Sequence, residues 1–203
     1  MEPLWPVSCG LQCPYFPYPG LFLRGLVLEK VTTSSSLNIA PLLRVNLAGE
    51  YGAKRIYKGQ LAILKNSPSA PLLEHMKAQE EVHLHTFEEW VVKNRVRPTL
   101  LQPLWHVAGY ALGAGTALLG EKAAMACTAA VEEVIDAHYE KQLHRLKKQN
   151  PALSKIIKKF QKEEQDHRDL ALEKGAEEAP AYALLSQGIK TASRLAIWLS
   201  ERM

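Results

Sequence analysis

The sequence predicts an all-α fold, a four-helix bundle with polar residues in its interior. Long stretches repeat apolar residues at steps of three and four, the period of a helix, and prolines or glycines separate them. On four of these stretches a glutamate, alone or with a histidine, occupies a core-facing position. Burying such groups without partners costs several kcal/mol, so a metal ion is the economical partner for them.

Composition places the chain among globular proteins. Of its 203 residues, 47% are hydrophobic and 23% are charged, which suits one domain with or without a tail. The net charge of +4 is mild and the cations alternate with acids, so nucleic acid is not expected as a partner. Residues 141–162 are locally basic and suit an anionic membrane surface. Three cysteines give no disulfide framework, and Cys9 and Cys13 lack a second pair for zinc, which fits a reducing compartment.

Residues 1–36 differ from the rest because prolines alternate with aromatic residues there. Arg24, Lys30 and the serines 34–36, with few acids, are loosely similar to a mitochondrial presequence, although no amphipathic helix is evident. A targeting segment and a disordered extension both remain open. We therefore predict a boundary after residue 36, with the helical domain spanning 37–203.

The first two predicted helices cover residues 40–65 and 71–94. Pro41 suits the first turn of one, and the other ends before Pro98. Glu50 lies among the leucines of the first helix. In the second helix two polar residues share the core-facing positions with apolar ones: Leu73, Met76, Glu80, His83, Phe87 and Trp90.

Residues 98–120 carry no charge and include Gly109, Gly113 and Gly115. The run is long enough to suggest a membrane span, but Pro103, His106 and the glycines argue against one. We predict a crossover segment that is either buried or dips into one membrane leaflet.

Three further helices are predicted over residues 121–149, 152–174 and 181–202, with Gly175 as a C-cap. Glu132 faces the core on the first, and Glu164 and His167 do so on the second. The last is an additional amphipathic helix, on which Trp198 near Arg194 suits a membrane interface as well as a packed face.

The polar residues repeat. Glu50 and Glu80 are 30 residues apart, Glu132 and Glu164 are 32 apart, and the second glutamate of each pair has a histidine three residues later. Tyr57 and Tyr139 each follow the first glutamate by seven. A single Glu-x-x-His is usually a solvent-exposed pair, but its repetition at matched spacing indicates a duplicated helix pair and a metal site.

Four carboxylates and two imidazoles suit iron or manganese better than calcium or zinc. This is the known arrangement of ferritin-like di-iron bundles. In that template the glutamates paired with histidine bridge two ions, the histidines each bind one ion, and the other glutamates are terminal ligands. Tyr57, Tyr139 and His138 are candidates for contacting the ligands, the tyrosines as hydrogen-bond donors to buried carboxylates. The predicted ligands are Glu50, Glu80, His83, Glu132, Glu164 and His167.

Several blocks within residues 37–203 resemble the demethoxyubiquinone hydroxylases of ubiquinone biosynthesis. Matched to that family one by one, its iron ligands fall on the same six residues. The family commonly has Asp-His where this chain has Asn46 and Leu47, and the connection around Asn150 is shorter. The blocks that carry the resemblance are 48–53 (AGEYGA), 112–120 (LGAGTALLG), 124–128 (AMACT), 131–133 (VEE), 179–182 (APAY) and 199–202 (LSER).

The resemblance implies a mitochondrial enzyme on the matrix side of the inner membrane, peripheral to it. It implies two iron ions per chain and hydroxylation of the ring of a demethoxy polyprenyl quinol, with dioxygen and electrons from NADH. A lipid-binding partner protein of the biosynthetic complex is implied as well. The uncharged 98–120 segment and the last helix are the expected entry for the apolar tail.

Three other interpretations use the same residues. Iron storage is disfavoured because storage centres usually lack the second Glu-x-x-His. A membrane-associated scaffold would use the polar positions only to fix helix register and would bind no metal. A di-manganese catalase or another di-iron oxidase would share the ligands, and only the family blocks argue against it.

Overall fold

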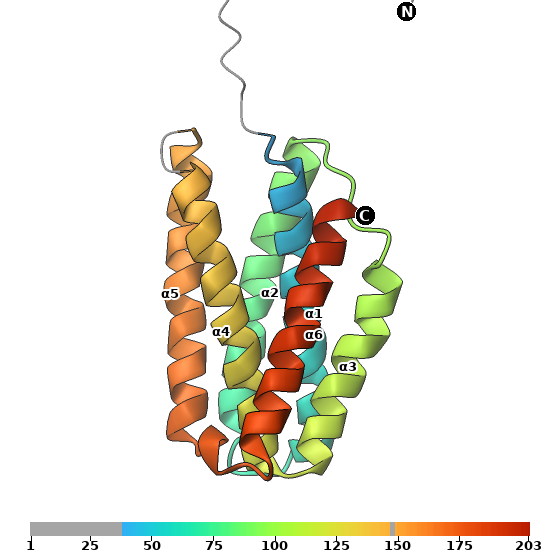
Figure 1. Ribbon diagram of the computed structural model, residues 1–203, viewed down its shortest axis with the longest axis vertical. Helices are drawn as coiled ribbons and strands as arrows, with labels where there is room; N and C mark the ends of the chain where they lie inside the picture. The colour runs from blue at the N-terminus through green and yellow to red at the C-terminus, as the bar shows by residue number, and fades with distance from the viewer. Residues whose placement is uncertain (1–37, 147–148) are drawn as a thin grey trace, which may run out of the picture. The chain divides into compact units, whose positions relative to one another are not determined.

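The computed structural model describes residues 38–146 and 149–203. These residues form α-helices with one short 3-10 helix and no strand, which confirms the predicted all-α class (Figure 1). The prediction for residues 1–36 lies outside the described residues. The elements are α1 Ala40–Leu64, α2 Ala70–Lys93, α3 Gln102–Leu118, α4 Glu121–Leu146, α5 Pro151–Glu173, η1 Ala176–Glu178 and α6 Tyr182–Arg202.

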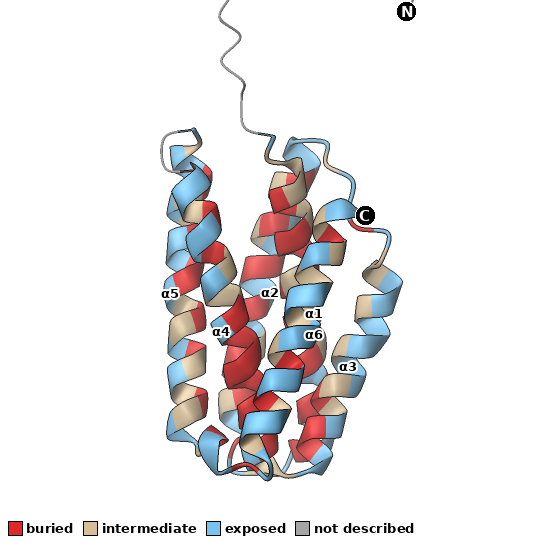
Figure 2. Cartoon of the chain, viewed as in Figure 1, coloured by how far each residue is buried: buried red, intermediate tan, exposed pale blue. Residues whose placement is uncertain are grey.

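Helices α1, α2, α4 and α5 form the bundle, and α3 and α6 lie outside it. In the bundle α1 packs on α2 and α4 on α5, whereas α3 lies along α1 and α6 contacts both α4 and α1 (Figure 1). Each helix of the bundle turns a buried stripe inward (Figure 2). The ferritin-like bundle with an added crossover helix and C-terminal helix is therefore as predicted.

Two of the three apolar clusters of the core are separated along the bundle axis, and the third packs α6 against α1 and α4. One gathers around Leu73, Met76 and Met125, and the other around Phe87 and Phe160. On all four bundle helices the candidate ligands fall between residues of one cluster and residues of the other. The polar layer is consequently enclosed by apolar packing at both ends.

Helix α3 is a surface helix, so the alternative of a buried crossover is wrong. Only Gly113, Thr116 and Ala117 of this helix are buried. Glycines bring its backbone against α1: a Cβ atom added at Gly113 would lie 2.0 Å from the carbonyl oxygen of Ile56. This close approach uses one face of the helix, and the larger apolar side chains point outward. Among the described residues, no helix combines the length and apolarity needed to span a bilayer.

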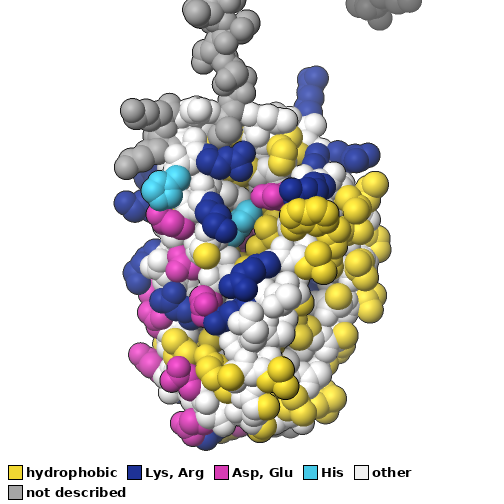
Figure 3. Space-filling view, in the orientation of Figure 1, with side chains coloured by type: hydrophobic (Ala, Val, Ile, Leu, Met, Phe, Trp, Pro, Cys, Tyr) yellow, Lys and Arg dark blue, Asp and Glu magenta, His cyan; other side chains and the backbone are white. Residues whose placement is uncertain are grey.

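The last helix also leaves much of its apolar surface exposed. Leu184, Leu195 and Trp198 are 78%, 56% and 51% exposed, whereas Ser186, Ile189 and Ser200 are buried. Hydrophobic side chains gather over the α3 and α6 side of the molecule (Figure 3). Helices α3 and α6, which are not consecutive in the sequence and both lie outside the bundle, thus share one apolar surface.

Candidate metal centre

The structure brings all six candidate ligands together in the polar layer. Helices α1 and α4 contribute one glutamate each, and α2 and α5 contribute a glutamate and a histidine each. The residues form two overlapping groups, Glu50–Glu80–His83–Glu164 and Glu80–Glu132–Glu164–His167, and within each group the ligand atoms lie within 4.8 Å of one another. Glu80 and Glu164 belong to both groups, so two neighbouring ions could be held here with these two carboxylates in common.

The atoms that face this layer lack hydrogen-bond partners. Both carboxylate oxygens of Glu80 and of Glu164 are buried without one, as are the Nδ1 atoms of both histidines. His83 Nδ1 lies 3.0 Å from Glu164 Oε1, and His167 Nδ1 lies 3.3 Å from Glu80 Oε1. Buried polar atoms are normally satisfied. Carboxylate oxygens and imidazole nitrogens that converge without hydrogen-bond partners are therefore a suitable set of ligands for metal ions.

Electrostatics of the protein alone show the same need for cations. Burial and the neighbouring Glu164 carboxylate raise the pKa of Glu80 and of Glu132 well above the ordinary value. Burial opposes ionisation of Glu164 as well, but His167 and His83 lower its pKa to about 2. Burial works to lower the pKa of His83, yet the Glu164 carboxylate beside it raises that pKa to about 11. Bound divalent cations would let the carboxylates ionise and the imidazoles be neutral.

The two tyrosines occupy equivalent places across the repeat. Tyr57 on α1 donates to Glu132 Oε1 at 2.9 Å, and Tyr139 on α4 donates to Glu50 Oε1. Both side chains are fully buried. Each tyrosine thus satisfies one oxygen of a terminal glutamate on the other helix and leaves the second oxygen facing the layer. The predicted tyrosine–carboxylate contacts are present.

An apolar cavity of about 180 Å³ lies beside this layer, between α1, α3, α4 and α6. Its wall includes Gly49 and Val131, the neighbours in sequence of Glu50 and Glu132, and small residues of α6 such as Ala192 and Ala196. The histidines come from α2 and α5, on the other side of the layer. An apolar molecule in the cavity would therefore approach the layer from the side of the two terminal glutamates.

Comparison with known proteins places the chain in a family. The family described as ubiquinone biosynthesis protein COQ7 matches residues 38–200. The chain belongs to this family. The COQ7 match therefore covers the whole described domain except its last three residues.

Three relatives illustrate the match. A protein of Rhodospirillum rubrum named 3-demethoxyubiquinol 3-hydroxylase is 59% identical over 162 residues, covering 79% of this chain and 76% of the relative. The mouse protein named NADPH-dependent 3-demethoxyubiquinone 3-hydroxylase, mitochondrial, is 46% identical over 202 residues, covering 95% and 92%. The yeast 5-demethoxyubiquinone hydroxylase, mitochondrial, is 41% identical over 179 residues, covering 80% and 77%.

Two residues that contact the histidines were missed by the sequence analysis. His83 Nε2 lies 2.9 Å from Glu163 Oε2, and His167 Nε2 lies 3.0 Å from Gln79 Oε1. Each partner immediately precedes a glutamate of the opposite Glu-x-x-His pair. This shared position in the repeat was visible in the sequence, but the contact joins two helices and cannot be read from the spacing within one.

His138, the third candidate for contacting the ligands, takes part in a different network. Gln142 exchanges two hydrogen bonds with Asn46, at 2.9 and 2.7 Å, and lies 2.6 Å from His138 Nε2. The amide of Gln142 is thus the donor and His138 Nε2 the acceptor, which requires a neutral imidazole. Asn46 thus lies within a network of neutral groups.

Acid should weaken the fold through His138. Burial, with Lys141 and Arg145 nearby, lowers the pKa of this histidine from 6.5 to about 4. Between these values the unfolded chain binds a proton that the folded chain does not, so stability falls as the pH drops from 6.5 to 4. Partial exposure of the side chain reduces the loss below what the pKa difference alone implies, so we expect the free energy of unfolding to fall by about 1–2 kcal/mol. Urea unfolding of the wild type and of His138→Gln at pH 7 and pH 5 measures this loss, and the variant should lack the part that His138 causes. An identical pH dependence of the free energy of unfolding in both proteins would contradict the role of His138.

Proposed function

We propose that the chain is a di-iron monooxygenase that hydroxylates the ring of a demethoxy polyprenyl quinol in ubiquinone biosynthesis. One observation carries the proposal: a buried layer of carboxylates and imidazoles without hydrogen-bond partners lies beside an apolar cavity. The names of the relatives, demethoxyubiquinol and demethoxyubiquinone hydroxylases, support the substrate class.

In the proposed centre Glu50 and His83 belong to one ion and Glu132 and His167 to the other. Glu80 and Glu164 lie between the two groups and are shared by both. Bound irons would supply dioxygen reduction with two electrons from the nicotinamide reductant and two protons, so that one oxygen atom would enter the ring and the other would leave as water. Carboxylate ligands suit this chemistry because a carboxylate can bind one ion or bridge two, which leaves coordination positions open for dioxygen.

The tyrosines and the surrounding apolar clusters define how the ligands are held. Tyr57 and Tyr139 fix the terminal glutamates by one oxygen, so that the other oxygen remains directed into the layer. Phe160 lies against the ring of His83, with ring centroids 3.9 Å apart. These contacts orient the ligands and exclude water from the layer, which strengthens electrostatic interactions within it.

The cavity is the proposed place for the quinol. Gly49 and Gly52 line it, and a Cβ atom at either position would meet nothing within 4 Å, so there is open space next to Glu50. The wall is almost wholly apolar and continues to Trp105 and Ile197, on the two helices that share the exposed apolar surface. A polyprenyl tail would extend along this wall while the ring lies next to the ligands.

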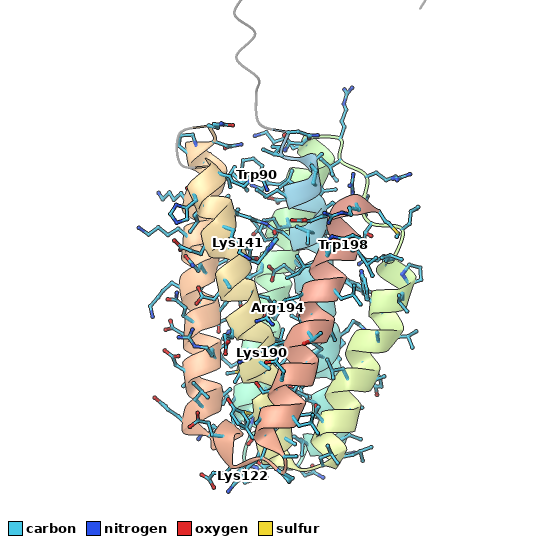
Figure 4. All side chains as sticks on the ribbon, in the orientation of Figure 1. Trp90, Lys122, Lys141, Lys190, Arg194 and Trp198 are labelled. Carbon is cyan, nitrogen blue, oxygen red and sulfur yellow. The ribbon has the colours of Figure 1, made fainter. Side chains whose placement is uncertain are left out.

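The apolar surface of α3 and α6 is the proposed contact with the matrix side of the mitochondrial inner membrane. Exposed cationic side chains border it: Arg194 lies on α6 and Lys141 on the neighbouring α4 (Figure 4). Lys190 of α6 is instead largely buried and forms an ion pair with Glu133 at 2.5 Å. Aromatic and cationic residues around an apolar surface are typical of helices that lie in the membrane interface.

We further propose a lipid-binding protein of the pathway as the partner that presents the substrate. The exposed apolar residues on α3, at its two ends and on α6 are Leu100, Leu104, Val107, Tyr110, Leu118, Leu119, Leu184, Leu195 and Trp198.

Iron content and product analysis test the proposal together. The purified chain is expected to hold about two irons per molecule and, with a demethoxy quinone, a nicotinamide reductant and air, to yield the hydroxylated ring. NADH and NADPH should be compared, since the sequence resemblance implies NADH and the mouse relative is named NADPH-dependent. Two irons without product would retain the metal centre and contradict the substrate. A chain that binds no metal would favour the scaffold interpretation.

Filling the cavity should separate substrate binding from metal binding. Ala196→Trp places a large ring in the cavity, so hydroxylation of a polyprenyl substrate is expected to fall by at least about tenfold, whereas iron content stays unchanged. Thr191→Trp, an exposed position of the same helix that does not line the cavity, is the matched control. Equal activity of the two variants would place the substrate elsewhere.

A further inference from the structure

The outer nitrogen atoms of the two histidines contact chemically different groups. His83 Nε2 meets a carboxylate oxygen of Glu163 at 2.9 Å, and His167 Nε2 meets the side-chain carbonyl of Gln79 at 3.0 Å. Glu163 and Gln79 occupy the same position of the two repeated helices, directly before Glu164 and Glu80. The duplicated centre is therefore symmetric in its ligands but not in the groups behind its histidines.

The direction of these hydrogen bonds follows from the inner nitrogens. Nδ1 of each ring faces the carboxylates of the layer and lacks a hydrogen-bond partner, so Nδ1 is the nitrogen available to a metal. The proton of a neutral ring then lies on Nε2, which must donate. A carboxylate only accepts, and Gln79 accepts through its carbonyl oxygen.

We propose that Glu163 is a positioning residue that makes His83 the stronger electron donor, so that the two iron positions are inequivalent. The inference rests on the proposed metal centre. A carboxylate that accepts a hydrogen bond from a ligating imidazole raises the basicity of that ligand more than a neutral amide does. The position beside His83 would accordingly favour ferric iron, and the position beside His167 would favour ferrous iron.

The other hydrogen-bonding groups at the ligands do not explain such a difference. Tyr57 and Tyr139 give both terminal glutamates the same donor. Lys159 lies 3.5 Å from Glu163, but it contacts Oε1, whereas Oε2 is the atom that faces His83. The lysine therefore lies on the solvent side of the carboxylate, and the acceptor for His83 remains in place without it.

Mössbauer spectra of the full chain, loaded with ⁵⁷Fe(II) without air, test the inference after iron content is measured. The wild type is expected to show two quadrupole doublets of equal area. Glu163→Gln should bring the doublets together and weaken binding of one of the two ferrous ions by about tenfold. Exchanging both residues, Gln79→Glu with Glu163→Gln, should restore two doublets. Lys159→Gln, which keeps the acceptor, should leave the wild-type spectrum.

The outcomes separate this inference from the proposed function. A single doublet in a wild-type chain that holds two irons overturns the inequivalence and leaves the metal centre standing. Two doublets that do not change in Glu163→Gln overturn the role of Glu163. A wild-type chain without iron overturns both proposals.

Discussion

Replacing Glu80 by leucine is expected to abolish iron binding while leaving the metal-free fold at least as stable as before. Neither oxygen of this carboxylate has a hydrogen-bond partner, and burial with the charge of Glu164 raises its pKa well above the ordinary value. An apolar side chain of similar size removes buried oxygens that lack partners, and leaving such a group unsatisfied costs about 1–3 kcal/mol. Hydroxylation should fall by more than about 100-fold, since changes to groups one step further from a metal already cost 10–100-fold.

Chemical unfolding with and without Fe(II) measures both halves of this expectation. At an iron concentration about 100 times the dissociation constant, the wild type should gain about 2.7 kcal/mol and the variant nothing. Glu74→Leu, at an exposed position of the same helix, is the control and should behave as the wild type. A Glu80→Leu chain that keeps two irons would remove this residue from the centre. If the wild type gains no stability from metal, the polar layer serves only helix register.

Helix positions and the composition of the polar layer followed from the sequence because both depend on local rules. Prolines and glycines end the helices, so the predicted 40–65 and 71–94 became Ala40–Leu64 and Ala70–Lys93. The helical period placed Glu50 and Glu80 on inward faces, and both are fully buried. The duplication then brought the two halves together at one level of the bundle.

Contacts between helices could not be predicted from the helical periodicity of the sequence. An uncharged stretch was compatible with a buried crossover, yet α3 is exposed because Gly109 and Gly113 face α1 while Leu104 and Leu118 face outward. Gly109 and Gly113, four residues apart, were the available signal for that close approach. Glu163 lies next to a ligand in sequence, but its relation to His83 on another helix exists only in three dimensions.

The largest effect on stability is expected from a single methyl group at Gly113. In Gly113→Ala the added Cβ atom would lie 2.0 Å from the carbonyl oxygen of Ile56 and 2.8 Å from its carbonyl carbon. These are backbone atoms of α1, which no side-chain rotation moves away, so α3 must shift outward. We expect a loss of about 3 kcal/mol or more in the free energy of unfolding, the upper end for overpacking.

Gly115→Ala separates this contact from the general effect of alanine in a helix. It lies two residues further along α3, is exposed, and a Cβ atom there meets nothing within 4 Å. Alanine should therefore stabilise that position by up to about 1 kcal/mol, through its helix propensity. Urea unfolding followed by circular dichroism compares the two variants, and effects of the same sign would contradict the close packing. Because Leu112 beside Gly113 lines the cavity, the shift of α3 should also lower hydroxylation in Gly113→Ala and leave it unchanged in Gly115→Ala.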